Sequence, residues 1–340
     1  MSRPQTSEQP PPHIDSTQAP VAYGSWALPK LSRELQDDEL VTRQRALAAL
    51  CELVHDPEMA YDAIFNGCME SLKSLLQDED GLVRVKTAEV LYVLAAHSLG
   101  REAFLKYDVI GPLANLLEDP VDTCRKNVHQ ALNRIAEFPS GAVFMVSMGL
   151  VPKLVLKIPV EEANIRALIL STLSCCVRVN AMPALESDAI SVLRDQLSHP
   201  SPNIRREATS ALVGISVPAN GKMKVCEEDL LPMLVKLLSD DDQGVIANAA
   251  GTIMNTAVIT KGKYEALKAG AITPLLQLVV SENTAVCANA LRALTVLAEV
   301  PRARAELLEH VPLLKTRLQH TDSIIQRAAS TAIEVISWKP

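Results

Sequence analysis

Apolar residues recur along the chain in pairs of helix-like stretches that are separated by a short acidic turn. The pattern is plainest over Leu72–Leu94, with the sequence LKSLLQDEDGLVRVKTAEVLYVL. Leu72 and Leu76 are four residues apart, and Leu91 and Leu94 are three apart, so each pair shares one face of a helix. Two such helices cannot bury their apolar faces alone, and the pattern therefore predicts stacking against similar pairs on either side.

The same pattern repeats along the chain at a nearly constant interval. Three apolar series share steps of 41, 41, 41, 39, 41, 41 and 39 residues. The first series is Leu31, Leu72, Leu113, Leu154, Leu193, Leu234, Leu275 and Leu314. The second, from the second helix, is Leu50, Leu91, Leu132, Leu173, Leu212, Ile253, Leu294 and Ile333. The third is Leu35, Leu76, Leu117, Ile158, Leu197, Leu238, Val279 and Leu318. This is the period of armadillo and HEAT repeats, so we predict an all-α fold, a right-handed α-solenoid of about eight armadillo/HEAT-like repeats over residues 26–340.

Polar residues at the turns support this register. Gly or Asp stands five residues before the first-series leucine in six repeats, where it is expected to end one helix before the next begins. Asp78 lies in the turn between the paired helices, six residues before Arg84. An Asp there can cap the second helix, and an Arg of the next repeat can reach its carboxylate, which predicts a ladder along the stack. The equivalent residues are Asp37 and Arg43, and Asp119 and Arg125. Arg166 and Arg205 continue the arginine series without a matching Asp.

Residues 1–25 differ in kind from the repeats. They are rich in proline and poor in large apolar groups, so we expect a disordered or extended tail. Tyr23 and Trp26 follow, beside the first repeat, and Trp338 lies near the other end of the chain. These aromatic residues are interpreted as caps on the ends of the stack. The alternative is that one aromatic end docks on a partner.

Composition restricts the classes of function. Of the 340 residues 48% are hydrophobic and 3% aromatic, which suits close packing of helices, and the net charge of −7 disfavours a broad face for nucleic acid. No apolar run approaches the length of about 20 residues that spans a bilayer, and the N-terminus lacks the pattern of a signal peptide. The chain is therefore expected to be soluble and intracellular, without nucleic-acid or membrane partners.

Sequence patterns for catalysis or metal binding are missing. The chain has no phosphate loop, no GxGxxG after a strand, and no HExxH or GxSxG motif, and its seven histidines show no metal-ligand spacing. Its seven cysteines include no CxxC pair and are expected to be reduced, structural thiols. We expect no enzyme activity, no catalytic residue, no cofactor, no metal and no small-molecule substrate.

Two positions on the second helix bear on peptide binding. In importin- and catenin-like armadillo proteins an Asn two residues after the second-series position contacts the peptide backbone, and in importins a Trp stands two residues before that position. Here only Asn255 matches the first rule, and no Trp matches the second. A peptide groove of this type is therefore disfavoured. Asn255 is either a packing residue or a contact for a partner.

One polar stripe is a candidate for protein binding. Lys126, Gln130 and Arg134 are spaced four residues apart, so they lie on one face of a helix. They are positioned to bind an acidic helix or tail. The alternative is a solvated helix face.

Several stretches carry a resemblance to a known family. The segment SWALPKLSRELQDDELVTRQRALAALCELVHDPE at Ser25–Glu58, together with NGCMESLKSLL, VITKGKYEAL and the closing WKP, resembles the radial spoke head 14 homologues. These are armadillo-repeat proteins of ciliary and flagellar axonemes. The resemblance implies a non-enzymatic subunit of the radial spoke that supports ciliary and sperm motility. Its implied partners are other spoke stalk and head proteins, and its implied location is the cytoplasm and cytoskeleton, in the axoneme of a cilium or flagellum.

Two classes of function thus stay open. The first is a structural subunit of the spoke that is bound through its helical surfaces. The second is a cytosolic adaptor that holds an extended peptide reversibly in its concave groove.

Overall fold

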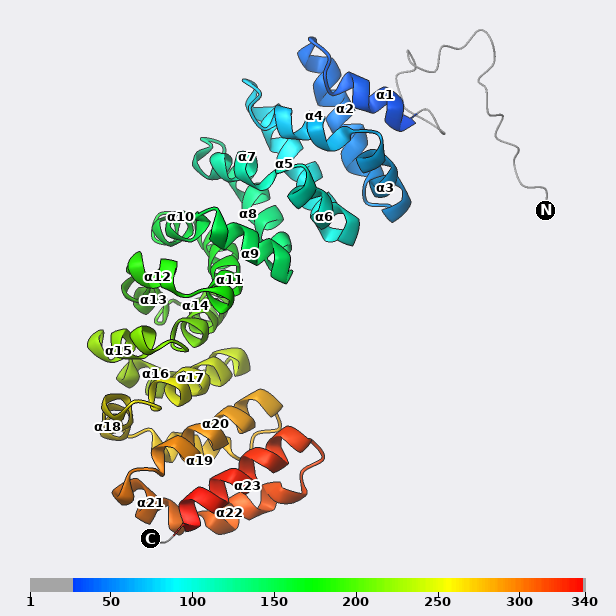
Figure 1. The fold of residues 1–340 in the computed structure, drawn as a ribbon. Coiled ribbons are helices and arrows are strands. Elements are labelled where there is room, and N and C mark those ends of the chain that lie inside the picture. The colour runs from blue at the N-terminus through cyan, green and yellow to red at the C-terminus, as the bar shows by residue number, and fades with distance from the viewer. Residues whose placement is uncertain (1–26, 339–340) are drawn as a thin grey trace, which may run out of the picture. The chain divides into compact units, whose positions relative to one another are not determined.

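The computed structural model describes residues 27–338, and these consist of helices, turns and bends without a β-strand (Figure 1). The eight predicted repeats are present, so the all-α, solenoid-type fold class is confirmed. The described residues fall into two compact units, one that ends at Leu150 and one that begins at Val151, and each is considered by itself. The expected division of the chain into a tail of residues 1–25 and one repeat domain of residues 26–340 stays a prediction.

Seven of the repeats have three helices, and the described part of the first repeat has two. The third helix of each repeat is the longest, with 14 to 17 residues. The third helices are α2 (Leu40–Leu53), α5 (Gly81–Ala96), α8 (Asp122–Ala136), α11 (Ala163–Val179), α14 (Pro202–Ile215), α17 (Gln243–Thr256), α20 (Thr284–Leu297) and α23 (Ser323–Ser337). They pack on one another in sequence order within each unit, from α2 to α8 and from α11 to α23.

The second helices carry the first apolar series. They are α1 (Ala27–Glu34), α4 (Cys68–Leu75), α7 (Ile110–Asn115), α10 (Leu150–Lys157), α13 (Ala189–Gln196), α16 (Leu231–Leu237), α19 (Ile272–Leu278) and α22 (Val311–Lys315). The 3₁₀ turns Leu116–Glu118 and Thr316–Gln319 extend α7 and α22. The predicted pair over Leu72–Leu94 is therefore the pair α4 and α5.

Each predicted helix pair after the first is preceded by a further helix, the first helix of the repeat, which the apolar pattern does not predict. These first helices are short, between five and nine residues, and they precede the second helix of each repeat. They are α3 (Pro57–Phe65), α6 (Ser98–Lys106), α9 (Pro139–Ser147), α12 (Met182–Glu186), α15 (Ala219–Glu227), α18 (Thr260–Lys268) and α21 (Pro301–Leu308).

The three apolar series form the core of each unit. Every member of the first series is at most 2% exposed. The second and third series are buried in the same way, with two exceptions in the last repeat. Ile333 is only half-buried, and Leu318 is 40% exposed. Both predictions of burial are wrong because, among the described residues, no further repeat packs on α22 and α23.

The six predicted Gly or Asp turn residues lie between the first and second helices. All six have positive φ angles, between 52° and 81°. They are Gly67, Asp108, Gly149, Asp188, Asp229 and Gly270. Glycine adopts this left-handed conformation without a steric penalty, and Asp tolerates it better than most residues, which explains why these two types recur there.

A second kind of glycine brings each first helix close to the preceding third helix. A Cβ atom added at Gly221 of α15 would lie 1.7 Å from the carbonyl oxygen of Ile215, the last residue of α14. A Cβ atom at Gly100, Gly141 or Gly262 would lie 1.9 to 2.2 Å from a carbonyl oxygen in the last turn of α5, α8 or α17. No larger residue fits this approach without a shift of the backbone. Glycine recurring in the first helix is therefore a packing signal that the apolar pattern did not include.

The cysteines are structural in character. All seven are free thiols, and six are buried. Burial raises the pKa of Cys176 to about 12 and that of Cys68 to about 11, so these groups stay protonated at neutral pH.

Among the described residues no single helix is long and apolar enough to cross a bilayer; α9 and α10 reach that length and composition only as a bent pair.

Candidate protein-binding surface

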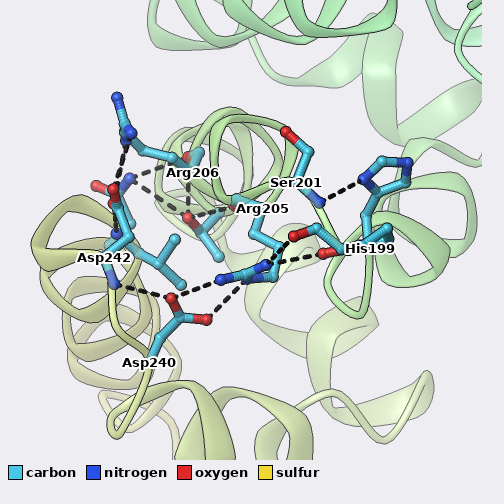
Figure 2. Close-up of polar contacts among 10 residues, drawn as sticks. His199, Ser201, Arg205, Arg206, Asp240 and Asp242 are labelled. Atoms are coloured by element: carbon cyan, nitrogen blue, oxygen red, sulfur yellow. Dashed lines mark hydrogen bonds and ion pairs between the residues drawn. The ribbon is translucent and has the colours of Figure 1, made fainter. Parts of the chain in front are cut away.

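Charged side chains join the start of one third helix to the turn before the next. Arg205 of α14 donates from Nε and Nη2 to the two carboxylate oxygens of Asp240, at 2.7 and 2.9 Å (Figure 2). Arg206 donates in the same way to Asp242, at 3.0 and 2.8 Å. The hydrogen bond from Arg206, opposed by partial burial, holds the pKa of Asp242 below its ordinary value. Two arginines and two aspartates thus form a double link between adjacent repeats.

The predicted ladder is present, but its direction is reversed. Arg43 donates to Asp78 at 3.0 Å, and Arg84 donates to Asp119 at 2.6 Å. In each pair the arginine belongs to the earlier repeat, whereas we expected it to come from the later one. The expectation was wrong because the arginine stands in the first turn of its third helix, from which its side chain extends toward the turn of the following repeat. Arg205 is therefore matched after all, by Asp240.

The aspartates of the ladder do not cap helices as predicted. Asp78 accepts a hydrogen bond from the backbone N–H of Asp80, two residues on, at 2.9 Å. Asp80 is the residue that caps α5, by accepting from the N–H of Val83. The first Asp of the turn thus shapes the turn and receives the arginine, while the second Asp caps the helix.

Two arginines of the series have other contacts. Arg125 forms an ion pair with Asp122 of its own helix at 2.8 Å. Arg166 donates to the amide oxygen of Gln196 at 3.2 Å. The arginine series ends at Arg205, because Ile246 occupies the equivalent position in the next repeat. Ile246 packs in a buried apolar cluster that includes Val286.

Asparagine side chains make a second kind of link between repeats. Each donates from Nδ2 to a backbone carbonyl oxygen 42 residues earlier, on the preceding third helix, at 2.9 to 3.2 Å. The four donor and acceptor pairs are Asn127 to Val85, Asn248 to Arg206, Asn255 to Val213, and Asn289 to Ala247. Asn255 also donates to Oγ of Ser216 at 3.2 Å. Its amide nitrogen therefore already holds α17 against α14, and its proposed contact with a partner stays a prediction.

Asn255 lines a pocket that we call the C-terminal pocket. The pocket has a volume of about 490 Å³ and is lined by residues of α17, α20 and α23, together with Val258, which follows α17. The lining includes Arg292, Val296 and Thr331, which occupy the two helix positions considered above for peptide binding. The sequence thus indicated which face of the third helices carries a hollow, although not its chemistry.

The predicted polar stripe lies on α8. Lys126 and Arg134 are exposed, and Gln130 is half-buried between them. Across the part of the chain that the structure describes, no ion pair involves Lys126 or Arg134. The placement is compatible with binding to an acidic partner, which stays a prediction.

The aromatic ends are described only in part. Tyr23 and Trp26 lie outside the described residues, so their role stays a prediction. Trp338 follows α23, and the guanidinium of Arg304 on α21 lies 4.9 Å from the centre of its ring. This cation–π contact fixes the last aromatic residue to the first helix of its own repeat.

One carboxyl group on the third helices is electrostatically unusual. Partial burial raises the pKa of Glu207 on α14 above its ordinary value, although a hydrogen bond with Ser171 and the charges of Arg206 and Arg178 act in the opposite direction. Among residues 27–338 no cluster of His, Cys, Asp or Glu has the arrangement of a metal site.

The repeated helices and the links between them define a structural scaffold of helical repeats. The family described as non-SMC mitotic condensation complex subunit 1 (Cnd1) matches residues 58–162 and 164–333. The chain therefore belongs to the Cnd1 family of HEAT-like repeat proteins.

Comparison with individual proteins adds two similarities. Radial spoke protein 14 of Chlamydomonas reinhardtii is 32% identical over 131 residues, which are 38% of this chain and 34% of that protein. The match thus spans about a third of the length of this curated relative. An engineered protein of known crystal structure has a TM-score of 0.86 and 23% identity, and the match covers 92% of this chain and 79% of that one. This second likeness concerns the fold alone.

Proposed function

We propose that the protein is a non-enzymatic structural subunit of the axonemal radial spoke. Its identity of 32% over 131 residues with Radial spoke protein 14 carries this proposal. The partners would be other stalk and head proteins of the spoke, and the location would be the axoneme of a cilium or flagellum. The role would be to support ciliary and sperm motility through protein–protein contacts.

The contacts between repeats support a scaffold role. Arg205 with Asp240 and Asn255 with Val213 join adjacent repeats through side chains that are at least partly buried. A subunit of a moving assembly has to transmit force between its ends, and a bond that crosses a repeat boundary resists the separation of the two repeats that it joins. A protein of this kind needs no reaction centre.

Fractionation of motile cilia tests the proposal. Cilia are demembranated with detergent and washed with salt, and the protein is detected in the axoneme and in the soluble fraction. We expect retention in axonemes and loss from axonemes that lack radial spokes. Retention that does not depend on spokes would contradict the proposal.

Two other results would point to different functions. Complete release into the soluble fraction would favour a cytosolic adaptor that binds an extended peptide. Association with mitotic chromosomes would favour a role like the one in the family's description, condensation of chromosomes, which the Cnd1 match makes worth examining. Imaging of a tagged protein through the cell cycle separates this second outcome from the axonemal one.

A further inference from the structure

Much of the lining of the C-terminal pocket is apolar and open to solvent. Met254, Val258, Val296 and Ile324 line it from three consecutive repeats. Val258 is 55% exposed and Ile324 is 47% exposed, although both are large apolar side chains. Their exposure leaves apolar surface that would gain free energy on contact with an apolar group of a partner.

Two cations stand at the same pocket. Arg292 of α20 and Arg327 of α23 line it, and both are exposed. Neither has an ion-pair partner among residues 27–338. Arg84 and Arg205, on other third helices, are each paired with an Asp, whereas Arg134 of α8 has no ion pair among the described residues. In a chain with a net charge of −7, these two exposed guanidinium groups form a local basic site, and they differ in this from the paired Arg84 and Arg205.

We propose that the C-terminal pocket binds an acidic segment of a partner protein, with an apolar side chain against its apolar lining and carboxylates at Arg292 and Arg327. The inference deepens the proposed function, on which it rests, by naming the surface and the chemistry of one partner. A basic segment would be repelled by the two guanidinium groups. A nucleic acid would need a far larger basic surface than two arginines in an acidic chain.

The mode of recognition follows from the contacts of Asn255. Its amide nitrogen donates to Val213 and Ser216, so only its Oδ1 is left to accept a hydrogen bond from the backbone of an extended peptide. Recognition at this pocket therefore depends on charge and on the apolar anchor. Charge complementarity sets the choice of partner and the rate of encounter, while a buried apolar anchor contributes much of the affinity.

The test uses the purified full-length chain and a fluorescein-labelled decapeptide in which Leu alternates with Glu. Two further peptides replace every Glu by Gln or every Leu by Ser. The charge-reversed variant is R292E/R327E, and the conservative variant is R292K/R327K. The matched control is K268E/R302E, which makes the same change in net charge at exposed residues of α18 and α21 outside the pocket. Unchanged thermal melting establishes that each variant is folded.

We expect R292E/R327E to bind the acidic peptide about tenfold more weakly than the unmodified chain, or worse, because attraction at two positions becomes repulsion. Binding to K268E/R302E should stay within about threefold, and R292K/R327K should retain most of the affinity because it keeps both charges. Both altered peptides should bind weakly. Equal losses in the two charge-reversed variants, or no binding by the unmodified chain, would overturn the proposal.

The two proposals fail separately. Peptide binding is measured on the purified chain and does not depend on axonemes, so a negative result there overturns the pocket alone. Release of the unmodified chain from washed axonemes overturns the spoke role alone.

Discussion

Arg205 and Asp240 are 35 residues apart in the sequence and are joined by two hydrogen bonds, of 2.7 and 2.9 Å. The side chains are 16% and 8% exposed, so water screens the pair only in part. The same guanidinium also donates to the carbonyl oxygens of His199 and Pro200, at 2.9 and 3.0 Å. One side chain therefore fixes the turn of its own repeat and the turn of the next.

Removal of this arginine should weaken the boundary between two repeats. We expect Arg205→Ala to lower the free energy of unfolding by about 2 kcal/mol, because Asp240 is left partly buried without its charged partner. Urea unfolding followed by circular dichroism measures the change. Arg194→Ala is the control, because Arg194 is 46% exposed and lies 3.7 Å from Glu228. That substitution should cost less than about 0.5 kcal/mol, and equal losses would contradict the role given to Arg205.

The close approach at Gly221 makes a prediction about volume. Gly221→Ala should lower stability by about 1 to 3 kcal/mol, because the added Cβ meets the carbonyl oxygen of Ile215 and forces a backbone shift. Gly111→Ala is the control, since its Cβ would meet only Met148 at 3.6 Å. In a helix that change should be neutral or stabilising by up to about 1 kcal/mol. Thermal unfolding of both variants checks the prediction, which a stable Gly221→Ala protein would refute.

The raised pKa of Glu207 predicts a dependence of stability on pH. Between the ordinary glutamate pKa and the raised folded-state pKa, the folded chain binds more protons than the unfolded chain, so stability falls as pH rises through that range. At pH 7, above the ordinary glutamate pKa, the raised folded-state pKa lowers the stability of the folded chain. Glu207→Gln should therefore raise the melting temperature at pH 7, and the gain should disappear near about pH 4.

Glu334→Gln provides the comparison for this pH series, since Glu334 is exposed on α23. Its effect on the melting temperature should be small at every pH. A gain for Glu207→Gln that persists unchanged into acid would show that the carboxylate charge is not its cause.

Asn255 should contribute to stability in its own right. Asn255→Asp keeps the shape of the side chain but removes the N–H donor to Val213 and Ser216, so we expect a loss of about 1 to 2 kcal/mol. Asn220→Ala, at an exposed position of α15, should stay within about 0.5 kcal/mol. Chemical unfolding of the two variants distinguishes a packing role for Asn255 from a role confined to binding.

The stripe on α8 gives a prediction about partners. K126E/R134E should reduce the recovery of spoke proteins with a tagged chain about tenfold, if the stripe contacts an acidic partner. R33E/K106E reverses two other exposed cations of the same unit and should leave recovery unchanged. Intact recovery with K126E/R134E would favour the alternative of a solvated helix face.

The sequence was sufficient to locate the repeats because their buried residues recur at nearly constant steps. Leu72 and Leu91 mark α4 and α5, and the same spacing locates the other pairs. The short first helices were missed because their close packing depends on residues such as Gly221 rather than on a long apolar stripe. Leu318 was wrongly predicted to be buried because a period describes the interior of an array and not its last member.

Less of the candidate binding surface could be predicted from the sequence. The spacing of Asp78 and Arg84 indicated a ladder, but spacing alone does not say whether an arginine side chain reaches the earlier or the later turn. The helix positions of Asn255 and Arg292 identified the relevant face. The grouping of Arg292 with Arg327 could not be predicted, because it depends on how side chains from different repeats meet around one hollow.

Ile246 stands at the position that Arg205 occupies one repeat earlier. The stability of different repeat boundaries therefore depends on different solution conditions. Added salt weakens the attraction between charged groups, so it acts on the boundaries that Arg84 and Arg205 hold. Cooling weakens the burial of apolar groups, so it acts on the boundary that Ile246 and Val286 hold. Where the array first frays is thus not a fixed property of the fold, and ionic strength and temperature would select different starting points along the same chain.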